Sequence, residues 1–258
     1  MMPQGADSKA GKMLLRVIAI LALVSLMAEG AQRQRWRGRR YEPPVPLQLT
    51  IAPNYSFARV QFQSFRSGRN PGWSHDYPRA ERNLLRILAE VTNVHTQPAA
   101  HTIVQLASDE ITFYPILYFS EPGEWAITPE EVENFHAYLG RGGFAIFDDF
   151  DGPWDWENFE SCMRLVLPER HLELIPLEDP VFQSFFHIKS LEMTNPTGRS
   201  TPSFWGIRDD AGRVQVIANF NNDIGEYWEW SEHGYYPIEL SNEGYKLGIN
   251  YIIYALTH

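Results

Sequence analysis

The chain has 258 residues, of which 44% are hydrophobic and 14% aromatic, enough to bury a full core and to exclude global disorder. Its single cysteine, Cys162, excludes an internal disulfide and any cysteine-based zinc or iron–sulfur site. The net charge is −10, but residues 1–40 carry a net +6, which leaves −16 on the rest. This acidic part should repel nucleic acid and anionic lipid surfaces. It either attracts cations or basic partners or only keeps the domain soluble.

A mostly apolar stretch at residues 14–28 follows two lysines near the amino end. It is short for a membrane span and suits the core of a signal peptide, and the small residues after it allow cleavage after Gly30. We therefore predict that residues 1–31 are a signal peptide and that the protein is periplasmic or secreted. An uncleaved membrane anchor is the alternative, because the arginine-rich residues 33–40 would hinder translocation.

Residues 32–53 are first basic and then rich in proline, a composition that favours extended chain and disfavours helix. We interpret them as a linker. Residues 54–258 have the length of a single α/β domain. Contact with a membrane is expected only through the N-terminal segment.

The first part of this domain alternates between predicted strands and helices. Alternating side chains or short apolar runs predict strands, and apolar residues at helical spacing predict helices. The elements are a strand at 56–62, a loop at 64–78, a helix at 79–92, a strand at 102–106 and a buried parallel strand at 116–119.

A further helix is predicted to start at Thr128, because Pro129 suits the first helical position and Glu131 completes a capping box. Glycine predicts its end at Gly140. The apolar strand at 143–147 comes next and runs straight into a cluster of acids.

The second half of the domain continues the alternation. Its predicted elements are a helix at 156–167, an extended segment at 173–176, a hairpin at 206–219, a polar and aromatic loop at 221–230 and a closing helix at 244–256. Strands that alternate with helices imply a mostly parallel sheet with helices on both faces. Cys162 lies near the inward face of its helix and is interpreted as a core residue.

Several segments together match one known family, in order along the chain. They are Phe57–Phe62, Asn83–Leu85, Tyr114–Tyr118, Glu131–Leu139, Gly142–Asp149, Pro168–Arg170, Pro176–Phe182, Tyr245–Asn250 and Tyr254–Thr257. These segments span about residues 55–257 and resemble the bacterial family called domain of unknown function 4159. The resemblance implies a three-layer, flavodoxin-like α/β fold similar to that of class I glutamine amidotransferases. It implies no activity, because the function of the family is unassigned.

The chain departs from the pattern of that family at two places. Ser120–Gly123 stand where the family often has Gly-His, and Phe150 stands where it often has a cysteine. An amidotransferase needs a cysteine on a tight turn between glycines, whereas Cys162 lies in a predicted helix between Ser161 and Met163. Amidotransferase chemistry is therefore not expected. The Gly-x-Ser-x-Gly and phosphate-loop patterns are also absent from the sequence.

Three acids, Asp148, Asp149 and Asp151, follow the strand at 143–147. In open α/β sheets, ligands bind beyond the carboxyl ends of the strands, often where the strand order reverses. Such carboxylates can hold Mg²⁺ or Ca²⁺, or they can act as general acids and bases. The nearby Trp154 suits the stacking wall of a sugar site. The structural alternative is that Asp148 or Asp149 caps the next helix or binds loop amides.

A second polar group contains Asn222 and Asp223, which follow the predicted strand that ends near Asn219. If this strand neighbours the strand at 143–147, the two loops face each other and both residues join the ligand-binding site. An ordinary surface loop is the alternative. His75 and the other histidines are scattered singly, and we expect surface or core residues rather than ligands.

Two hypotheses for the function follow from these features. The first is a non-catalytic binding or interaction module of the cell envelope that uses the acid cluster. Its partner would be another envelope protein or a small ligand, and not nucleic acid. The alternative is a metal-dependent hydrolase that uses the same carboxylates with Mg²⁺ or Ca²⁺, on a carbohydrate-like substrate. The sequence leaves open whether the protein is an enzyme.

Overall fold

The computed structural model describes residues 55–66, 71–196, 198 and 200–258. The predicted signal peptide and the predicted linker therefore lie outside the described residues. Within the described ranges, no helix combines the length and the apolar character needed to cross a membrane.

The described residues form a seven-stranded sheet in the order β2-β1-β3-β4-β7-β6-β5. Its strands are β1 (Phe57–Val60), β2 (His101–Val104), β3 (Ile116–Ser120), β4 (Phe144–Phe150), β5 (Glu173–Leu174), β6 (Ser203–Arg208) and β7 (Val214–Phe220). The first five strands in that order are parallel, whereas β6 pairs antiparallel with both β7 and β5. The mostly parallel sheet and the predicted hairpin are thus confirmed.

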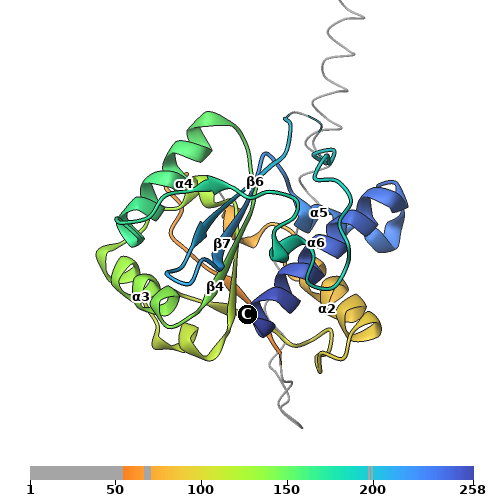
Figure 1. Ribbon diagram of the computed structural model, residues 1–258, viewed down its shortest axis with the longest axis horizontal. Coiled ribbons are helices and arrows are strands. Elements are labelled where there is room, and N and C mark those ends of the chain that lie inside the picture. Colours follow the sequence, from red (N-terminus) through yellow and green to blue (C-terminus); the bar gives the residue numbers. More distant parts are fainter. Residues whose placement is uncertain (1–54, 67–70, 197, 199) are drawn as a thin grey trace, which may run out of the picture. The chain divides into compact units, whose positions relative to one another are not determined.

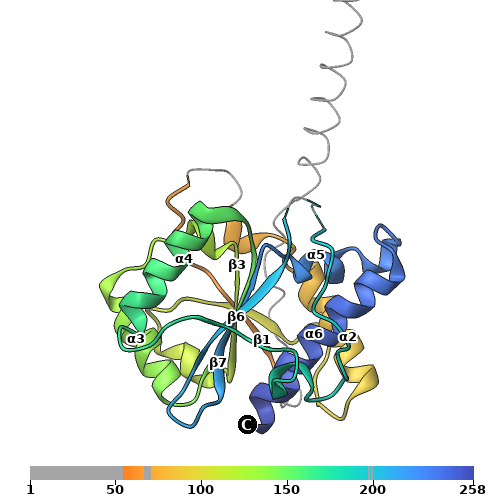
Figure 2. The same ribbon diagram turned by 45° about the horizontal axis from the view of Figure 1, so that its top comes forward.

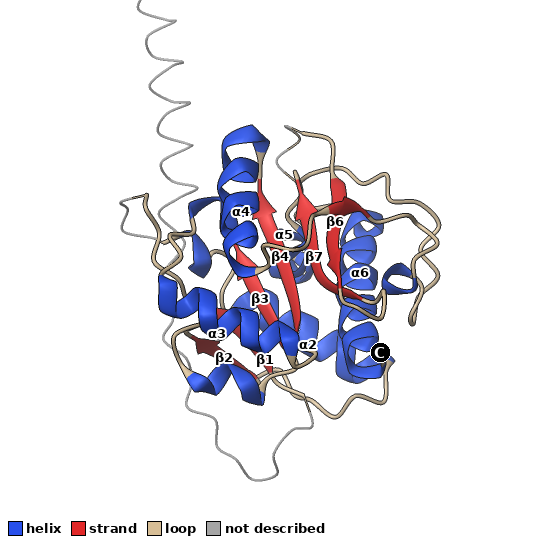
Figure 3. Cartoon of the chain, turned by 60° about the vertical axis from the view of Figure 1, so that its left-hand side comes forward, coloured by secondary structure: helices blue, strands red, loops and turns tan. Residues whose placement is uncertain are grey.

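Helices cover both faces of this sheet (Figures 1 and 2). One face carries α2 (Arg79–Val91), α5 (Ile224–Glu229) and α6 (Ile238–Thr257), and the other carries α3 (Pro129–Gly140) and α4 (Gly152–Val166). Figure 3 shows β3, β4, β7 and β6 side by side, with helices in front of them and behind them. The predicted α/β class is confirmed.

The side chains of β4 point alternately into two separate hydrophobic clusters, one on each face of the sheet. Phe144 and Ile146 pack in the cluster that includes α2 and α6, whereas Ala145 and Phe147 pack in the cluster that includes α3 and α4. Successive side chains of a strand point to opposite faces. The next residue on the first face is therefore Asp148, which is fully buried.

Local signals predicted several features correctly. Thr128 accepts a hydrogen bond from the Glu131 N–H, and the Glu131 carboxylate accepts one from the Thr128 N–H, which completes the predicted capping box. Cys162 is buried in the core on the α3 and α4 side, as expected. Several boundaries differ; for example, β4 runs on to Phe150, α4 begins at Gly152 instead of Trp156, and α6 begins at Ile238 instead of Gly244.

The prediction of a loop at 221–230 was wrong, because this segment contains α5. Asp223 caps the helix by accepting a hydrogen bond from the Glu226 N–H at 2.8 Å. Tyr227 and Trp228 are buried in it. The polar and aromatic residues that suggested an exposed loop are instead a capping acid and core side chains.

The strand order reverses at β1. The chain runs from β1 through α2 to β2 on one side, and β3 then lies on the other side of β1. The connections after β1 and β3 lead to α2 and α3, which cover opposite faces (Figure 1). The carboxyl ends of β1 and β3 therefore flank a topological switch point, where open α/β sheets bind ligands.

Candidate functional site

Five polar side chains gather at the switch point from four segments of the chain. His75 and Asp76 lie between β1 and α2, Glu121 follows β3, Asp149 lies in β4, and Asp223 follows β7. The strands β1, β3, β4 and β7 are adjacent and parallel. Their carboxyl ends therefore meet at one edge of the sheet and bring these side chains together.

A bulge at the end of β4 separates the side chains of Asp148 and Asp149. The register between β4 and β7 shifts between Phe147 and Phe150, and Asp149 has a left-handed φ of 61°. A bulge of this kind bends a strand and redirects a side chain. Asp149 therefore leaves the alternation of the strand, and its Oδ2 lies 3.4 Å from Nδ1 of His75.

Asp148 lies in a fully buried hydrogen-bond network. Its Oδ2 accepts hydrogen bonds from the Tyr118 hydroxyl at 2.7 Å and the Gly225 N–H at 2.9 Å. Its Oδ1 accepts from the Asn219 side-chain amide at 3.0 Å and the Ile224 N–H at 3.2 Å. Burial raises the pKa of Asp148 to about 6, although these donors act to lower it. These contacts agree with a structural role for Asp148, although the backbone amides that it binds lie in the first turn of α5 and not in a loop.

Asp151 lies at the N-cap of α4 and accepts a hydrogen bond from the Asn195 side chain at 3.2 Å. Neither Asp148 nor Asp149 occupies that capping position. Among the described residues, the groups whose potential ligand atoms lie within 4.8 Å of one another include Asp149 but neither Asp148 nor Asp151. The structure thus brings only one of the three predicted acids to the switch point.

Asp76, Asp149 and Asp223 form what we call the carboxylate centre. One oxygen atom from each lies within 4.8 Å of the others. Burial, together with the charges of Asp149 and Asp76, raises the pKa of Asp223 well above its usual range. Burial and the charge of Glu121 likewise raise the pKa of Asp149. Crowded carboxylates of this kind repel one another, and a bound cation would relieve that repulsion.

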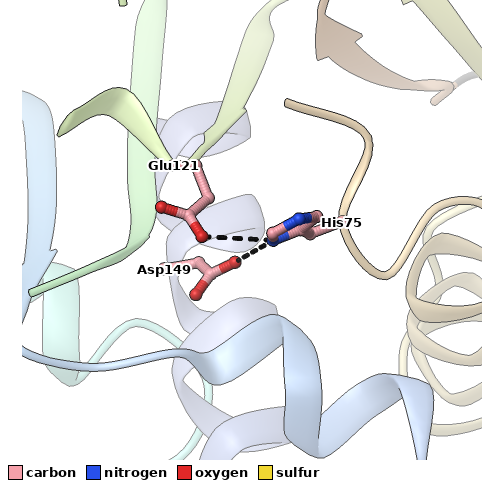
Figure 4. A group of neighbouring side chains, drawn as sticks. All are labelled: His75, Glu121 and Asp149. Carbon is pink, nitrogen blue, oxygen red and sulfur yellow. Dashed lines mark ion pairs between the residues drawn. The ribbon is translucent and has the colours of Figure 1, made fainter. Parts of the chain in front are cut away.

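His75, Glu121 and Asp149 form a second group, which we call the histidine centre (Figure 4). The Nδ1 atom of His75 lies 3.1 Å from Oε1 of Glu121 and 3.4 Å from Oδ2 of Asp149. Burial lowers the pKa of His75, but hydrogen bonds with Asp149 and Glu121 outweigh this effect and bring it to about 10. The imidazole is therefore a cation at neutral pH and balances part of the acidic charge.

A third group of acids adjoins the carboxylate centre and shares Asp76 with it. Its other members, Glu226 and Glu229, project from α5. Glu226 accepts a hydrogen bond from the Tyr236 hydroxyl at 2.9 Å, and Glu229 lies 3.5 Å from the Arg79 guanidinium. These contacts hold both glutamates beside the centre, where the charges of the glutamates add to its negative potential.

Three of the site residues have a left-handed backbone conformation, which residues other than glycine rarely adopt. The φ angles of Asp76, Glu121 and Asp149 are 64°, 54° and 61°. Within the described residues, the other non-glycine residue with positive φ is Asn221, at 57°. Each left-handed residue of this kind costs about 1–3 kcal/mol, and such strain concentrates at functional sites. Here the strained backbone occurs at the three residues whose side chains point into the site.

Arg59 of β1 holds the loop that carries His75. Its guanidinium is fully buried and forms an ion pair with Glu81 of α2. Its Nη1 donates hydrogen bonds to the carbonyl oxygens of Trp73 at 3.0 Å and His75 at 2.7 Å. The alternating pattern of β1 gave no sign that this arginine is a core residue.

The second predicted polar group reaches the site in part. Asp223 belongs to the carboxylate centre. Asn222 contributes its backbone, because its carbonyl oxygen accepts a hydrogen bond from the Asp149 N–H at 3.1 Å, while its side chain contacts Sδ of Met193 at 3.7 Å. The loops after β4 and β7 do face each other, since the two strands are neighbours.

Sequence reasoning missed His75, Asp76 and Glu121 as site residues. Their position shortly after β1 and directly after β3 was the available signal. That signal becomes specific only when the strand order is known, because the order shows that these two connections flank the switch point.

The domain that carries this site matches a known protein family over nearly its whole length. The family model described as Domain of unknown function (DUF4159) matches residues 56–256. A search of curated proteins found no match to the chain. The chain belongs to the DUF4159 family.

Proposed function

We propose that this DUF4159 protein is a binding module that holds a divalent cation, Mg²⁺ or Ca²⁺, in the carboxylate centre. The observation that carries the proposal is that Asp76, Asp149 and Asp223 bring carboxylate oxygens within 4.8 Å of one another at the switch point. Both ions take carboxylate oxygens as ligands, and Mg²⁺ usually keeps several waters. The bound ion would offer its remaining positions to a small ligand or to an acidic group of a partner.

A non-catalytic role is supported by the environment of the cysteine. Cys162 is buried in α4, and its Sγ lies 3.6 Å from the carbonyl oxygen of Trp125. Burial raises the pKa of this thiol to about 11. Because the thiolate is the reactive form, a thiol held in this way is a poor nucleophile at neutral pH.

The proposal extends to the finer fold class. The parallel strands follow the order β2-β1-β3-β4-β7, which corresponds to the 2-1-3-4-5 order of flavodoxin-like folds. This correspondence supports a flavodoxin-like fold of the kind that class I glutamine amidotransferases have. Such folds bind ligands at the switch point between their first and third strands, which is where the carboxylate centre lies.

We also propose that the protein acts in the cell envelope, on another envelope protein or a small ligand. The apolar residues 14–28 and the small residues after them support export through a cleaved signal peptide. Amino-terminal sequencing of the protein recovered from the periplasm or the medium tests this proposal. A mature chain that begins at Ala31 is expected, and a full-length chain in the cytoplasm would contradict export.

Isothermal titration calorimetry of the full chain with Mg²⁺ and with Ca²⁺ tests the binding function. We expect saturable binding that Asp223→Asn weakens at least about tenfold, the scale on which metal sites respond to lost contacts. Asparagine caps helices as well as aspartate does, so this change should preserve α5. Asp151→Asn is the matched control and should bind like the wild type. The absence of saturable binding at millimolar ion, or an equal loss in the control, would overturn the proposal.

A metal-dependent hydrolase is the second candidate function, and His75 is the observation that favours it. With a pKa of about 10, the imidazolium of His75 beside a cation site can donate a proton as a general acid. A carbohydrate-like substrate is supported by Trp154, whose side chain is 81% exposed at the start of α4. Turnover of a glycoside panel by the full chain with Mg²⁺ or Ca²⁺, lost in His75→Gln, would replace the binding proposal. No turnover would remove this candidate.

A further inference from the structure

The histidine centre has a donor set of its own, with a nitrogen atom as well as oxygens. Figure 4 shows the His75 ring pointing toward the carboxylates of Glu121 and Asp149, which come from two other segments of the chain. The Nδ1 atom faces both carboxylates at once, at 3.1 Å and 3.4 Å. Imidazole nitrogen is a ligand that zinc and its neighbours prefer, whereas Mg²⁺ and Ca²⁺ take oxygen.

The spacing of these donor atoms matches a coordination shell. Zinc bonds to nitrogen and to carboxylate oxygen are about 2.0–2.2 Å long, so two ligand atoms of one tetrahedral ion are about 3.4 Å apart. The two nitrogen–oxygen distances in the histidine centre, 3.1 Å and 3.4 Å, are close to this value. One ligand atom from each of the three residues lies within 4.8 Å of the others, so a modest shift of the side chains would bring all three around one ion.

Hydrogen bonds to the backbone fix each segment that carries a metal-ligand atom. The Glu121 N–H donates to the carbonyl oxygen of Asp148 at 3.0 Å, and the Asp149 N–H donates to that of Asn222 at 3.1 Å. The His75 carbonyl oxygen accepts from the buried Arg59. A ligand set held in place in this way loses little freedom when an ion binds.

The centre is also open to water. The side chains of His75, Glu121 and Asp149 are 13%, 18% and 16% exposed, so none is sealed in the core. Structural zinc sites have four protein ligands, whereas catalytic zinc sites have three and keep one position for water or substrate. Three protein ligands near the surface correspond to the second kind.

We propose that the histidine centre is a site for Zn²⁺ or a similar transition-metal ion. Its ligands are Nδ1 of His75, Oε1 of Glu121 and Oδ2 of Asp149, and one further position is open to water or to a ligand. Because the imidazole is a cation in the metal-free protein, binding of the ion releases the Nδ1 proton to solvent. The site shares Asp149 with the carboxylate centre, but it does not depend on Mg²⁺ or Ca²⁺ binding there.

Titration of the metal-free full chain with Co²⁺, whose visible absorption reports its ligands, tests the site, with Zn²⁺ as the competitor. The wild type should develop absorption bands that Zn²⁺ abolishes. His75→Gln should weaken Co²⁺ binding at least about tenfold. The matched control is His136→Gln, which removes a histidine of α3 that hydrogen-bonds to Val166 instead. Equal affinity in the wild type and His75→Gln, or no bands in the wild type, would overturn the proposal.

Two further measurements keep this test independent of folding and of the proposed function. Ring-nitrogen NMR of the wild type needs no substitution, and Zn²⁺ should shift the Nδ1 resonance of one of the eight histidines. A spectrum that Zn²⁺ leaves unchanged would contradict the site. Asp223→Asn should keep Co²⁺ binding while it weakens Ca²⁺ binding, whereas Glu121→Gln should do the opposite. The proposals for the carboxylate centre and for the histidine centre can therefore be contradicted independently of each other.

Discussion

Asp148 and Asp149 are consecutive residues, and they lie in two regions of opposite character. Asp148 is enclosed by four hydrogen-bond donors from β3, β7 and α5. Asp149 faces other acids and one histidine at the switch point. Asp148 is fully buried, whereas the side chain of Asp149 is 16% exposed, and this small difference in burial does not by itself distinguish a structural acid from a binding acid. The difference lies in what surrounds the carboxylate: neutral donors in one region, and charged groups that can share a cation in the other.

Replacing either aspartate by asparagine should distinguish the two regions, because the loss of stability should be large at Asp148 and smaller at Asp149. In Asp148→Asn the new amide group faces a backbone N–H in either orientation, that of Ile224 or that of Gly225. We expect the free energy of unfolding to fall by about 3–5 kcal/mol. Asp149→Asn should lower it less, by about 1–2 kcal/mol, because asparagine tolerates the left-handed conformation but removes one of the two carboxylates that pair with His75. Urea unfolding of both variants measures the contrast, and similar losses would contradict it.

The positive charge of His75 should make the stability of the protein depend on pH. The pKa of His75 is about 10 in the folded protein and about 6.5 in the unfolded chain. The charged imidazole therefore stabilises the folded protein fully below pH 6.5, and this stabilisation is lost as the pH rises through about 10. The wild type should lose about 3 kcal/mol more than His75→Gln across this window. Urea unfolding at pH 6.5, 8 and 9.5 checks it. Parallel pH dependences in the two proteins would show that His75 is not held as a cation.

Gly225 links the two regions, and its replacement should disturb both. A Cβ atom there would lie 2.8 Å from the Tyr118 hydroxyl and 3.0 Å from Oδ2 of Asp76. Gly225→Ala should lower the free energy of unfolding by about 1–3 kcal/mol through overpacking and should weaken cation binding. Gly140→Ala is the control, because its Cβ would meet nothing within 4 Å. A Gly225→Ala protein as stable as this control would show that the contact is loose.

The smallest effect is expected at the third acid of the sequence cluster. Asp151 is the N-cap residue of α4, but its side chain makes no capping hydrogen bond. Asp151→Asn should therefore change the free energy of unfolding by no more than about 0.5 kcal/mol, as is usual for surface substitutions. Thermal or urea unfolding checks this value. A larger loss would place Asp151 in the structural region with Asp148.

The sequence predicted the fold well where the signal was local. The capping box at Thr128 and the apolar run of β4 depend on neighbouring residues only, and both were correct. The segment of α5 was misread although it carries one local helix signal, Asp223 followed three residues later by Glu226. The glycine between them and the acids and aromatic rings that follow are also typical of a polar loop. Only the packing of this segment against α2 and α6 explains that composition.

The site was predictable only in part, for a physical reason. Asp149 and Asp223 were found because each follows an apolar strand. The side chains of Asp148 and Asp149 point in different directions because of a bulge in β4 that no pattern of residues in the sequence predicts. Glu121 and His75 join the site because β3 lies beside β1, and the pairing of strands far apart in the sequence is a property of the whole sheet.

We propose that Asp149, and not Asp148, is the acid of β4 that holds a cation. Anomalous diffraction from a crystal of the full chain soaked with Mn²⁺ would distinguish the two acids, because the ion can be located without any substitution. We expect a peak about 2.2 Å from an oxygen of Asp149, within the range of metal–carboxylate bonds. A peak beside Asp148 or Asp151, or no peak at the switch point, would contradict the claim.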